Sequence, residues 1–209
     1  MIEKLASKLG RNDEKPNIEL AQYLTESKDA EGILEIVEGY VGPDRATAND
    51  CIKVLYEIGE RNPALISQYA DRFVAHLRSR NNRLAWGSMT ALAKTAKINP
   101  QPIFDNLPTV VAAYETGSVI TVDNSISVFA ELCKAGDEYA EAVLPIILTH
   151  LKECRPKDVP QHAERASVCF SSSNADVFIE VLEKRLPNLA TPGQVRIKKL
   201  LKGLKDLNK

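Results

Sequence analysis

The chain has 209 residues, of which 44% are hydrophobic and 26% are charged, and these fractions are those of an ordinary globular protein. The formal net charge is −1, so the chain has no overall positive field that would attract nucleic acid or an anionic membrane. Aromatic residues make up only 6%, which predicts a core of aliphatic and small side chains, as in closely stacked helices.

The cysteines show none of the paired spacings that are typical of zinc sites. They are Cys51, Cys133, Cys154 and Cys169. No apolar run approaches the roughly 18 residues of a membrane span, and the opening MIEKLASKLG lacks the apolar core of a signal peptide. We therefore expect reduced thiols, no membrane span and a cytoplasmic location.

Along the chain, residues 1–15 are polar and predict a short capping helix or a loose tail. A first repeat over 16–42 is expected to pair a helix over 17–27 with a second over 30–41. In the second helix Ile33, Ile36 and Tyr40 share one face. Gly42-Pro43-Asp44 then breaks the chain and opens a second repeat over 43–79.

One apolar pattern, with spacings of 4, 3 and 4 residues, recurs with a period of 37. It reads Ala48, Ile52, Leu55 and Gly59 in the second repeat, Ala85, Met89, Leu92 and Ala96 in the third (80–116), Val122, Ile126, Phe129 and Cys133 in the fourth (117–154), and Val159, Ala163, Ala166 and Phe170 in the fifth (155–189). This spacing indicates one buried helical stripe. A fixed period of this size indicates an array of helical repeats.

The connections within the repeats carry their own signals. At Asn62-Pro63 and Asn99-Pro100, asparagine is expected to close one helix in a left-handed conformation and proline to open the next. Pro108 and Pro145 occupy equivalent places in the second helices of repeats three and four. Each either bends its helix or marks a later helix start.

The last repeat and the end of the chain follow the same pattern. The second helix of repeat five is expected to bury Ala175, Ile179, Leu182 and Leu186. A helix over 192–207 places Ile197, Leu200, Leu201 and Leu204 on one face, with lysines and arginines elsewhere. Such a helix is typical of the cap that closes the exposed core of a repeat array.

ALAKTAKINP (91–100), closing a first helix, and AVLPIILTHLKEC (142–154), forming a second, resemble the HEAT and armadillo-like helical repeats. The resemblance implies an all-α fold: a single domain over 1–209, built as a right-handed α-α superhelix of about five hairpins plus a capping helix. It also implies a non-catalytic scaffold or adaptor, without cofactors, that binds another protein or peptide along a concave face lined by the second helices.

The outward ridge of those second helices supplies the candidate partner-binding residues. They are Arg72, Asp105, Thr109, Ile146, Val177 and Val181. Along the array the ridge residues change from polar to aliphatic. An exposed aliphatic ridge is typical of a partner site. The alternative is that Val177 and Val181 pack against the terminal helix. Trp86 is a further candidate anchor, or else it covers a neighbouring loop.

A basic patch is predicted around one loop between repeats, where residues 61–100 hold seven Lys or Arg and one Asp. Besides Arg72 it comprises Arg78, Arg80, Arg83, Lys94 and Lys97. It would bind an anionic partner, or it is a solvated face balanced by the acidic repeats on either side, and the second interpretation is favoured. The basic residues of the terminal helix are interpreted in the same way.

No metal or catalytic site is expected. His76 and His150 are two periods apart and too distant to share a metal, and His162 stands alone. Lys152 and Arg155 predict a somewhat activated thiol at Cys154, without a catalytic base.

Two alternative functions remain open. The HEAT-type DNA alkylation repair glycosylases are similar in architecture and use Trp, Asp and Arg in a basic groove. Here only Trp86 matches, because Thr90 stands where the Asp is required. The second alternative is that the chain is a regulatory subunit of an enzyme complex and docks through the ridge around Ile146.

Overall fold

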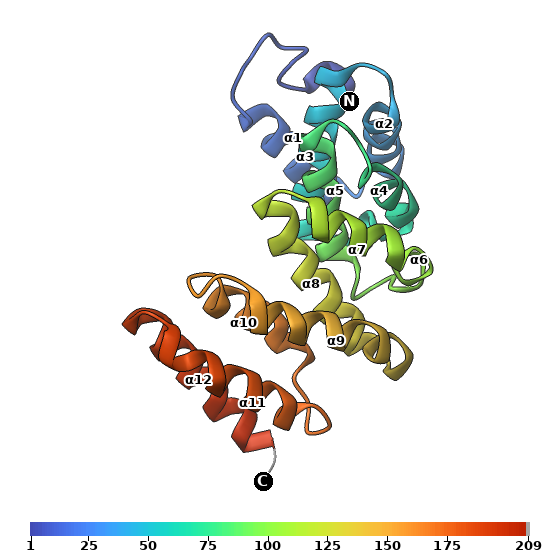
Figure 1. The fold of residues 1–209 in the computed structure, drawn as a ribbon. Coiled ribbons are helices and arrows are strands. Elements are labelled where there is room, and N and C mark those ends of the chain that lie inside the picture. Colours follow the sequence, from blue (N-terminus) through green and yellow to red (C-terminus); the bar gives the residue numbers. More distant parts are fainter. Residues whose placement is uncertain (208–209) are drawn as a thin grey trace. The chain divides into compact units, whose positions relative to one another are not determined.

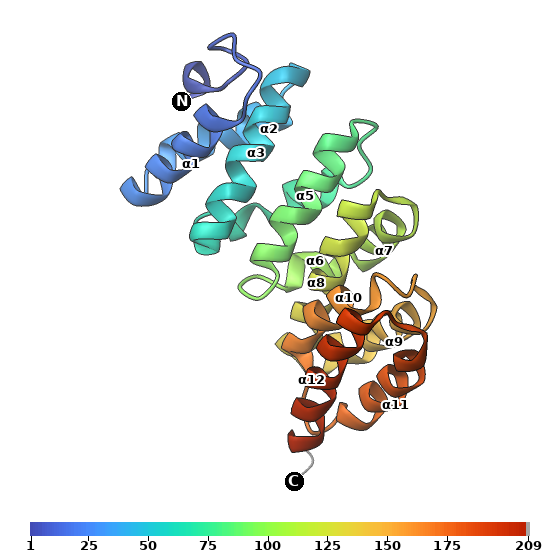
Figure 2. The ribbon, with the colours of Figure 1, turned by 90° about the vertical axis from the view of Figure 1, so that its left-hand side faces the viewer.

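The computed structural model describes residues 1–207, and the chain divides into two compact units, residues 1–125 (unit 1) and 126–209 (unit 2). All regular elements of the described residues are helices, so the predicted all-α class is confirmed (Figures 1 and 2). Helix α8 (Val119–Ala135) contributes residues to both units. The single domain over 1–209 stays a prediction.

In unit 1 the helices follow the predicted order of pairs. They are α1 (Lys15–Ser27), α2 (Ala30–Val41), α3 (Arg45–Arg61), α4 (Ala70–His76), α5 (Asn82–Thr95), α6 (Gln101–Asp105) and α7 (Leu107–Thr116), with 3-10 turns at Ile2–Lys4, Pro63–Leu65 and Ser67–Tyr69. The first helices α1, α3 and α5 pack side by side, and each second helix packs on a first helix, α2 on α3 and α4 on α5 (Figure 1).

Unit 2 continues the alternation. It contains α9 (Asp137–Glu153), α10 (Val159–Ala166), α11 (Ala175–Arg185) and α12 (Thr191–Leu207), with 3-10 turns at Ser167–Cys169 and Leu186–Asn188. Helix α11 packs on α9, and α12 packs on both α10 and α11. Ile197, Leu201 and Leu204 of α12 are buried, as a capping helix over 192–207 requires.

The helix starts have a local cause. Asp29 and Asp44 cap α2 and α3, because their side chains accept the amides of Gly32 (2.9 Å) and Thr47 (3.2 Å). Asn81 caps α5 by accepting the amide of Arg83. These short polar side chains satisfy amides that the helix itself leaves without a partner.

The 37-residue period places equivalent side chains in equivalent environments. Leu55 in α3, Leu92 in α5 and Phe129 in α8 are each 0% exposed. Helices α3 and α5 approach closely at Gly87, where a Cβ atom would lie 2.7 Å from Cγ1 of Ile52. The glycine therefore sets the spacing between these two first helices.

The two equivalent prolines have different effects. In repeat three the second helix is interrupted at Asn106, and Pro108 lies in the first turn of the new helix α7, where its missing amide costs nothing. In repeat four Pro145 lies inside the continuous helix α9. The later helix start is therefore found in repeat three, whereas repeat four keeps its proline inside the helix.

The prediction that asparagine adopts a left-handed conformation at the Asn-Pro turns is wrong. Asn62 has φ −150° and ψ 86°, and the only non-glycine residue with a positive φ among residues 1–207 is Lys28. The asparagine of the second turn acts through its side chain instead. Nδ2 of Asn99 donates to the carbonyl of Ser67 at 3.0 Å, which joins repeat three to repeat two.

The first fifteen residues are not a loose tail. Leu5 and Ala6 are buried, and the amide of Ala6 donates to Oδ1 of the fully buried Asn17 at 3.0 Å. Nδ2 of Asn17 donates in turn to Asp50 in α3 at 2.8 Å. This buried asparagine therefore fixes the segment against two first helices.

Tyr40 in α2 is the largest fully buried side chain of unit 1 and bonds beyond its own repeat. Its hydroxyl lies 2.7 Å from Oγ of Ser88 in α5, and it also donates to the carbonyl of Arg72 in α4 at 3.4 Å. Burial raises the pKa of the Tyr40 hydroxyl, so the group stays neutral. One side chain thus links three repeats.

Four charged side chains form a network across the first helices. Glu14 pairs with Lys53 of α3 (3.1 Å) and with Arg83 of α5 (2.5 Å), and Lys53 also pairs with Glu57 (2.8 Å). Burial acts to raise the pKa of Glu14, but the hydrogen bonds from Lys53 and Arg83 outweigh it and hold that pKa below its ordinary value of 4.5. The side chain of Lys53 is only 9% exposed, so its charge depends on these partners.

We predict that Tyr40→Phe lowers the free energy of unfolding by about 1–2 kcal/mol, because a buried hydrogen bond is lost and the cavity left behind is small. Tyr23→Phe removes a hydroxyl from a side chain that is 48% exposed and should change stability by less than about 0.5 kcal/mol. Urea unfolding of both variants measures the difference. Equal losses would contradict the role given to Tyr40.

We predict that Glu14→Gln lowers stability at neutral pH by about 0.5–1 kcal/mol, since the carboxylate is partly exposed and screened by solvent. The folded pKa of Glu14 lies below the unfolded one, so its stabilisation is complete above the unfolded pKa and is lost as pH falls through the folded pKa.

The difference between wild type and Glu14→Gln should therefore shrink between about pH 5 and pH 2. Unfolding by urea at several pH values measures this. Glu31→Gln, an exposed change in α2, is the control and should follow the wild-type curve. A difference for Glu14→Gln that is independent of pH would show that its charge is not responsible.

Candidate functional site

Acidic side chains gather on the second helices. In unit 1 the helices α2, α4, α6 and α7 carry six Asp or Glu against one Arg, whereas α1, α3 and α5 carry five Asp or Glu against six Lys or Arg. In unit 2 the helices α9 and α11 carry seven Asp or Glu against three Lys or Arg. All thirteen of these second-helix carboxylates are exposed. Charge is therefore segregated between the two helix rows, although the whole chain is nearly neutral.

In unit 1 the second helices form a continuous row (Figure 1). Tyr40 of α2 stacks on His76 of α4 with ring centroids 4.3 Å apart, and Nη2 of Arg78 donates to Oγ1 of Thr109 in α7 at 2.8 Å. We call the exposed side of α2, α4, α6 and α7 the second-helix face. Helices packed in this way lie about 8–10 Å apart.

A surface pocket of about 280 Å³ opens on this face between α4 and α7. Its lining is mostly polar and consists of Asp71, Val74, Ala75, Arg78, Asn106 and Thr109. The predicted residues Arg72 of α4 and Asp105 at the end of α6 are both exposed, and Oδ1 of Asp105 accepts a bond from Gln101 at 2.7 Å. The helices of this face thus carry Arg72, Asp105 and Thr109 of the predicted ridge, and Thr109 lines the pocket.

The aliphatic part of the ridge lies in unit 2 and is smaller than expected. Val177 of α11 is 40% exposed and Ile146 of α9 is half-buried. Val181 is only 3% exposed, so its assignment as a partner-binding residue is wrong. Its helix α11 packs against both α9 and α12.

The predicted basic patch does not form a single surface. Arg83 begins α5 and Lys94 ends it, so about 16 Å of helix separates them. Arg83 pairs with Glu14, and Lys94 pairs with Glu60 of α3 at 2.5 Å. These pairs favour the interpretation of a surface balanced by neighbouring acidic side chains. Arg80 and Lys97 are exposed at opposite ends of α5.

Trp86 lies on the row of first helices. Its ring packs against Tyr56 of α3 with centroids 5.8 Å apart, and the Arg83 guanidinium lies 5.8 Å from its ring centroid. Trp86 is half-buried in this position. These contacts favour its structural interpretation, since the ring joins α5 to α3.

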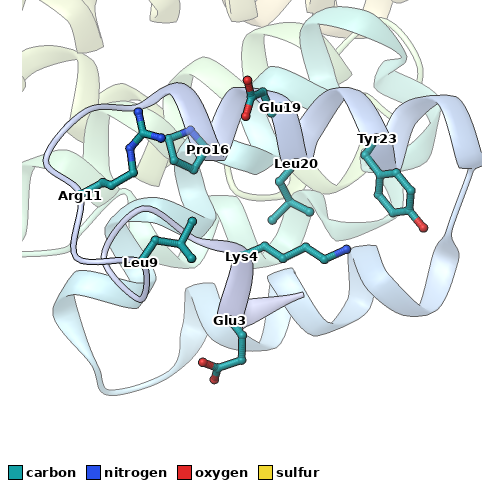
Figure 3. Close-up of a pocket in the computed structure, with 8 residues that line it drawn as sticks. All are labelled: Glu3, Lys4, Leu9, Arg11, Pro16, Glu19, Leu20 and Tyr23. Atoms are coloured by element: carbon teal, nitrogen blue, oxygen red, sulfur yellow. The ribbon is translucent and has the colours of Figure 1, made fainter.

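A second pocket, of about 410 Å³, lies between the N-terminal segment and α1 (Figure 3). Its apolar residues are Leu9, Pro16, Leu20 and Tyr23, and its charged residues are Glu3, Lys4, Arg11 and Glu19. Nζ of Lys4 lies 4.8 Å from the centroid of the Tyr23 ring, a cation–π contact. No candidate residue from the sequence falls in this pocket.

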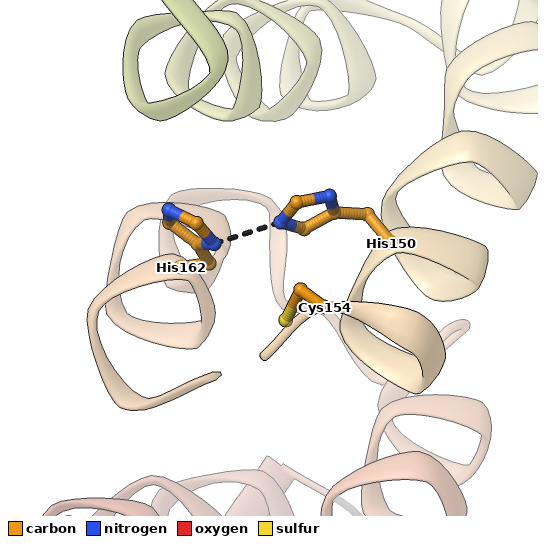
Figure 4. Close-up of side chains that lie close together, drawn as sticks. All are labelled: His150, Cys154 and His162. Atoms are coloured by element: carbon orange, nitrogen blue, oxygen red, sulfur yellow. Dashed lines mark hydrogen bonds between the residues drawn. The ribbon is translucent and has the colours of Figure 1, made fainter. Parts of the chain in front are cut away.

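One group of side chains was missed by the sequence reasoning. His162 does not stand alone, because its Nδ1 lies 2.7 Å from Nε2 of His150 (Figure 4). With Cys154 they form a group in which one nitrogen of each ring and the sulfur all lie within 4.8 Å of one another. The spacing of four residues between His150 and Cys154 places both on one helix face, which was the available signal. The sequence alone does not show how close His162 lies to α9.

The predicted activation of the Cys154 thiol is also wrong. Burial raises the pKa of the thiol, and the nearby guanidinium of Arg185 lowers it by less. The basic neighbours Lys152 and Arg155 are both exposed, and Nε of Arg155 pairs with Asp158 at 2.7 Å. Lys152 and Arg155 lie close to Cys154 in sequence, but they do not bring the pKa of its thiol below the ordinary value.

Among the helices of residues 1–207, none combines the length and the apolar character needed to cross a membrane. No protein-family model matches the sequence, and no curated protein matches it at a significant level.

Solved structures do match the fold over nearly the whole chain. A designed armadillo repeat protein in complex with the peptide (KR)4 is 12% identical with a TM-score of 0.66, and the match covers 94% of this chain and 91% of that one. A computationally designed armadillo repeat protein for modular peptide recognition is 12% identical with a TM-score of 0.69, covering 96% and 97%. An engineered protein is 18% identical with a TM-score of 0.65, covering 98% and 96%. The chain therefore has the armadillo and HEAT-like helical-repeat fold, an all-α superhelix.

Proposed function

We propose that this chain is a non-catalytic scaffold that binds a basic, extended segment of another protein along its second-helix face. The observation that carries the proposal is the segregation of charge. In unit 1 the second helices carry six exposed carboxylates against one Arg, while the first helices carry five Asp or Glu against six Lys or Arg. A surface with this excess of one charge attracts a partner of the opposite charge and repels phosphate.

The geometry of unit 1 suits an extended chain. An extended peptide advances about 3.3 Å per residue, so it would meet a new second helix about every third residue. The pocket between α4 and α7 offers Asp71 as an acceptor for a cationic side chain, and Asn106 and Thr109 as polar groups beside it. The designed armadillo protein of similar fold is described in complex with (KR)4, a peptide of this chemistry.

The acidic second helices favour a peptide over nucleic acid. A nucleic-acid-binding surface concentrates Lys and Arg, which neutralise phosphates. On the second-helix face of unit 1 the helices supply only Arg72, with Arg78 following α4. Arg83 and Lys94 are held in ion pairs on the first helices.

A labelled (KR)4 peptide tests the proposal by fluorescence anisotropy. The triple variant Glu31→Gln, Glu38→Gln, Asp71→Asn removes three exposed charges from α2 and α4. We expect its affinity for the peptide to fall about 10-fold, since three exposed pairs at about 0.5 kcal/mol each sum to about one decade. Added salt should weaken wild-type binding for the same reason.

The matched control removes three exposed charges from first helices by Glu19→Gln, Glu26→Gln and Glu60→Gln. It should bind within about twofold of the wild type, because a local face and not net charge determines affinity. Equal losses in both variants, or no saturable binding at low salt, would contradict the proposal. Tighter binding of duplex DNA than of the peptide would favour the nucleic-acid alternative.

The half-buried Ile146 and the exposed Val177 extend the proposal to unit 2 as apolar contacts for the same partner or for an enzyme subunit. We predict that Ile146→Glu reduces partner recovery in a pull-down, since a charge replaces an apolar contact. Thr149→Glu, an exposed change on the same helix, is the control. Unchanged recovery with Ile146→Glu would remove this residue from the binding surface.

A further inference from the structure

The side chains of His150, Cys154 and His162 meet in unit 2 at the place where α9 ends and α10 begins. His150 lies in the last turn of α9, and Cys154 follows it by one helical turn. His162 lies on the second turn of α10, where its amide donates to the carbonyl of Asp158 at 3.0 Å. Two helices thus supply three donor atoms that metals bind in proteins.

The connection between the helices is held in one shape by several bonds. The amide of Cys154 donates to the carbonyl of His150 at 2.8 Å, and Nε of Arg155 pairs with Asp158 at 2.7 Å. From α11, the guanidinium of Arg185 donates to the carbonyls of Lys152 and Cys154. The backbone that carries the sulfur is therefore anchored before any ligand binds.

The group is sheltered but accessible from one side. His150 is 8% exposed and His162 is 3% exposed, whereas Cys154 is only half-buried. Figure 4 shows the two imidazole rings facing each other across their hydrogen bond, with Cys154 beside them.

We propose that His150, Cys154 and His162 bind one Zn²⁺ ion, which joins the end of α9 to α10. Two imidazole nitrogens and one thiolate suit zinc and exclude magnesium and calcium, which require oxygen donors. Water completes the fourth position on the open side of Cys154, as in other zinc sites with three protein donors. None of the three proposed ligands is a carboxylate that carries the proposed function, so the two can fail separately.

The geometry requires only small movements. With Zn–N bonds of about 2.1 Å and a Zn–S bond of about 2.3 Å, tetrahedral donors lie about 3.3–3.6 Å apart. The two facing nitrogens, now 2.7 Å apart, must separate by about 0.6 Å. The sulfur must approach from within 4.8 Å of the nitrogens. Side-chain rotation supplies shifts of this size.

Zinc binding moves one proton within an imidazole ring and releases another from the thiol. One of the two facing nitrogens holds the proton of the His150–His162 hydrogen bond. When zinc binds, that imidazole carries its proton on its other ring nitrogen, so both facing lone pairs bind the ion. The Cys154 thiol releases one proton to the solvent and binds as thiolate. Binding of one Zn²⁺ thus releases one proton, with no oxidation or reduction.

Competition with a chromophoric zinc chelator tests the site on the full chain after removal of metals. The wild type should bind one equivalent of Zn²⁺, and Mg²⁺ should not compete. Cys154→Ser and His162→Gln should each lose at least about 100-fold in affinity, because loss of a ligand exceeds the 10–100-fold effect of losing an outer-shell partner. Co²⁺ should give thiolate-to-cobalt absorption that Cys154→Ser abolishes.

His76→Gln is the matched control, since His76 lies at the equivalent position 74 residues before His150 and in unit 1. It should bind zinc like the wild type. The His162→Gln variant keeps the buried thiols of Cys133 and Cys169. A loss of zinc affinity in this variant therefore cannot come from those thiols. Circular dichroism of the metal-free variants checks the fold, and Cys154→Ser decides the question if His162→Gln unfolds.

Stability gives an independent measurement. At free zinc about 100-fold above its dissociation constant, the ratio of folded to unfolded wild type should rise about 100-fold, with a higher Tm. The Tm of Cys154→Ser should not respond to zinc. No stoichiometric binding by the wild type, or zinc affinity equal to that of the wild type in both Cys154→Ser and His162→Gln, would overturn the proposal.

Discussion

The fold depends on one constraint: no helix pair in this chain can bury its apolar stripe alone. Leu92 of α5, for example, is fully buried, and α5 packs against both α3 and α4. Each pair therefore provides half of its neighbour's core, and the array requires a helix at its end with one apolar face. Helix α12 meets that requirement with Ile197, Leu201 and Leu204 turned inward and its cations exposed.

The same constraint explains how the two helix rows differ. First helices are enclosed by neighbours, so their charges are held in pairs such as Lys53 with Glu57 and Lys94 with Glu60. Second helices present one side to solvent, where charges such as Glu31 and Glu38 need no protein partner. Such a surface is free to carry a net charge, because solvent screens the repulsion between like side chains. Stability thus restricts one row and leaves the other available for recognition.

The repeat order could be predicted from the chain because helix periodicity is local. The stripe through Leu55 and Leu92 is visible in spacing alone, and its burial follows. The predictions that failed depend on contacts with a neighbouring helix or on the path of the chain between helices. Val181 has the pattern of an exposed ridge residue but is buried, in a helix that packs against both α9 and α12. The basic block appears continuous in sequence, although α5 spreads it over about 16 Å. The pair His150–His162 required knowledge of the path from α9 to α10, which spacing does not contain.

Tyr40 breaks the rule that a repeat contacts only its neighbours. Its hydroxyl meets Ser88, 48 residues further along the chain, from the first pair to the third. In an ideal linear array each pair can open or close with only its adjacent pairs responding. When the first pair opens, the Ser88 hydroxyl in the third pair loses its bond to Tyr40 and keeps only its bond to the carbonyl of Leu84. The first three pairs are thereby coupled into one cooperative folding block, and fraying from the N-terminal end is suppressed.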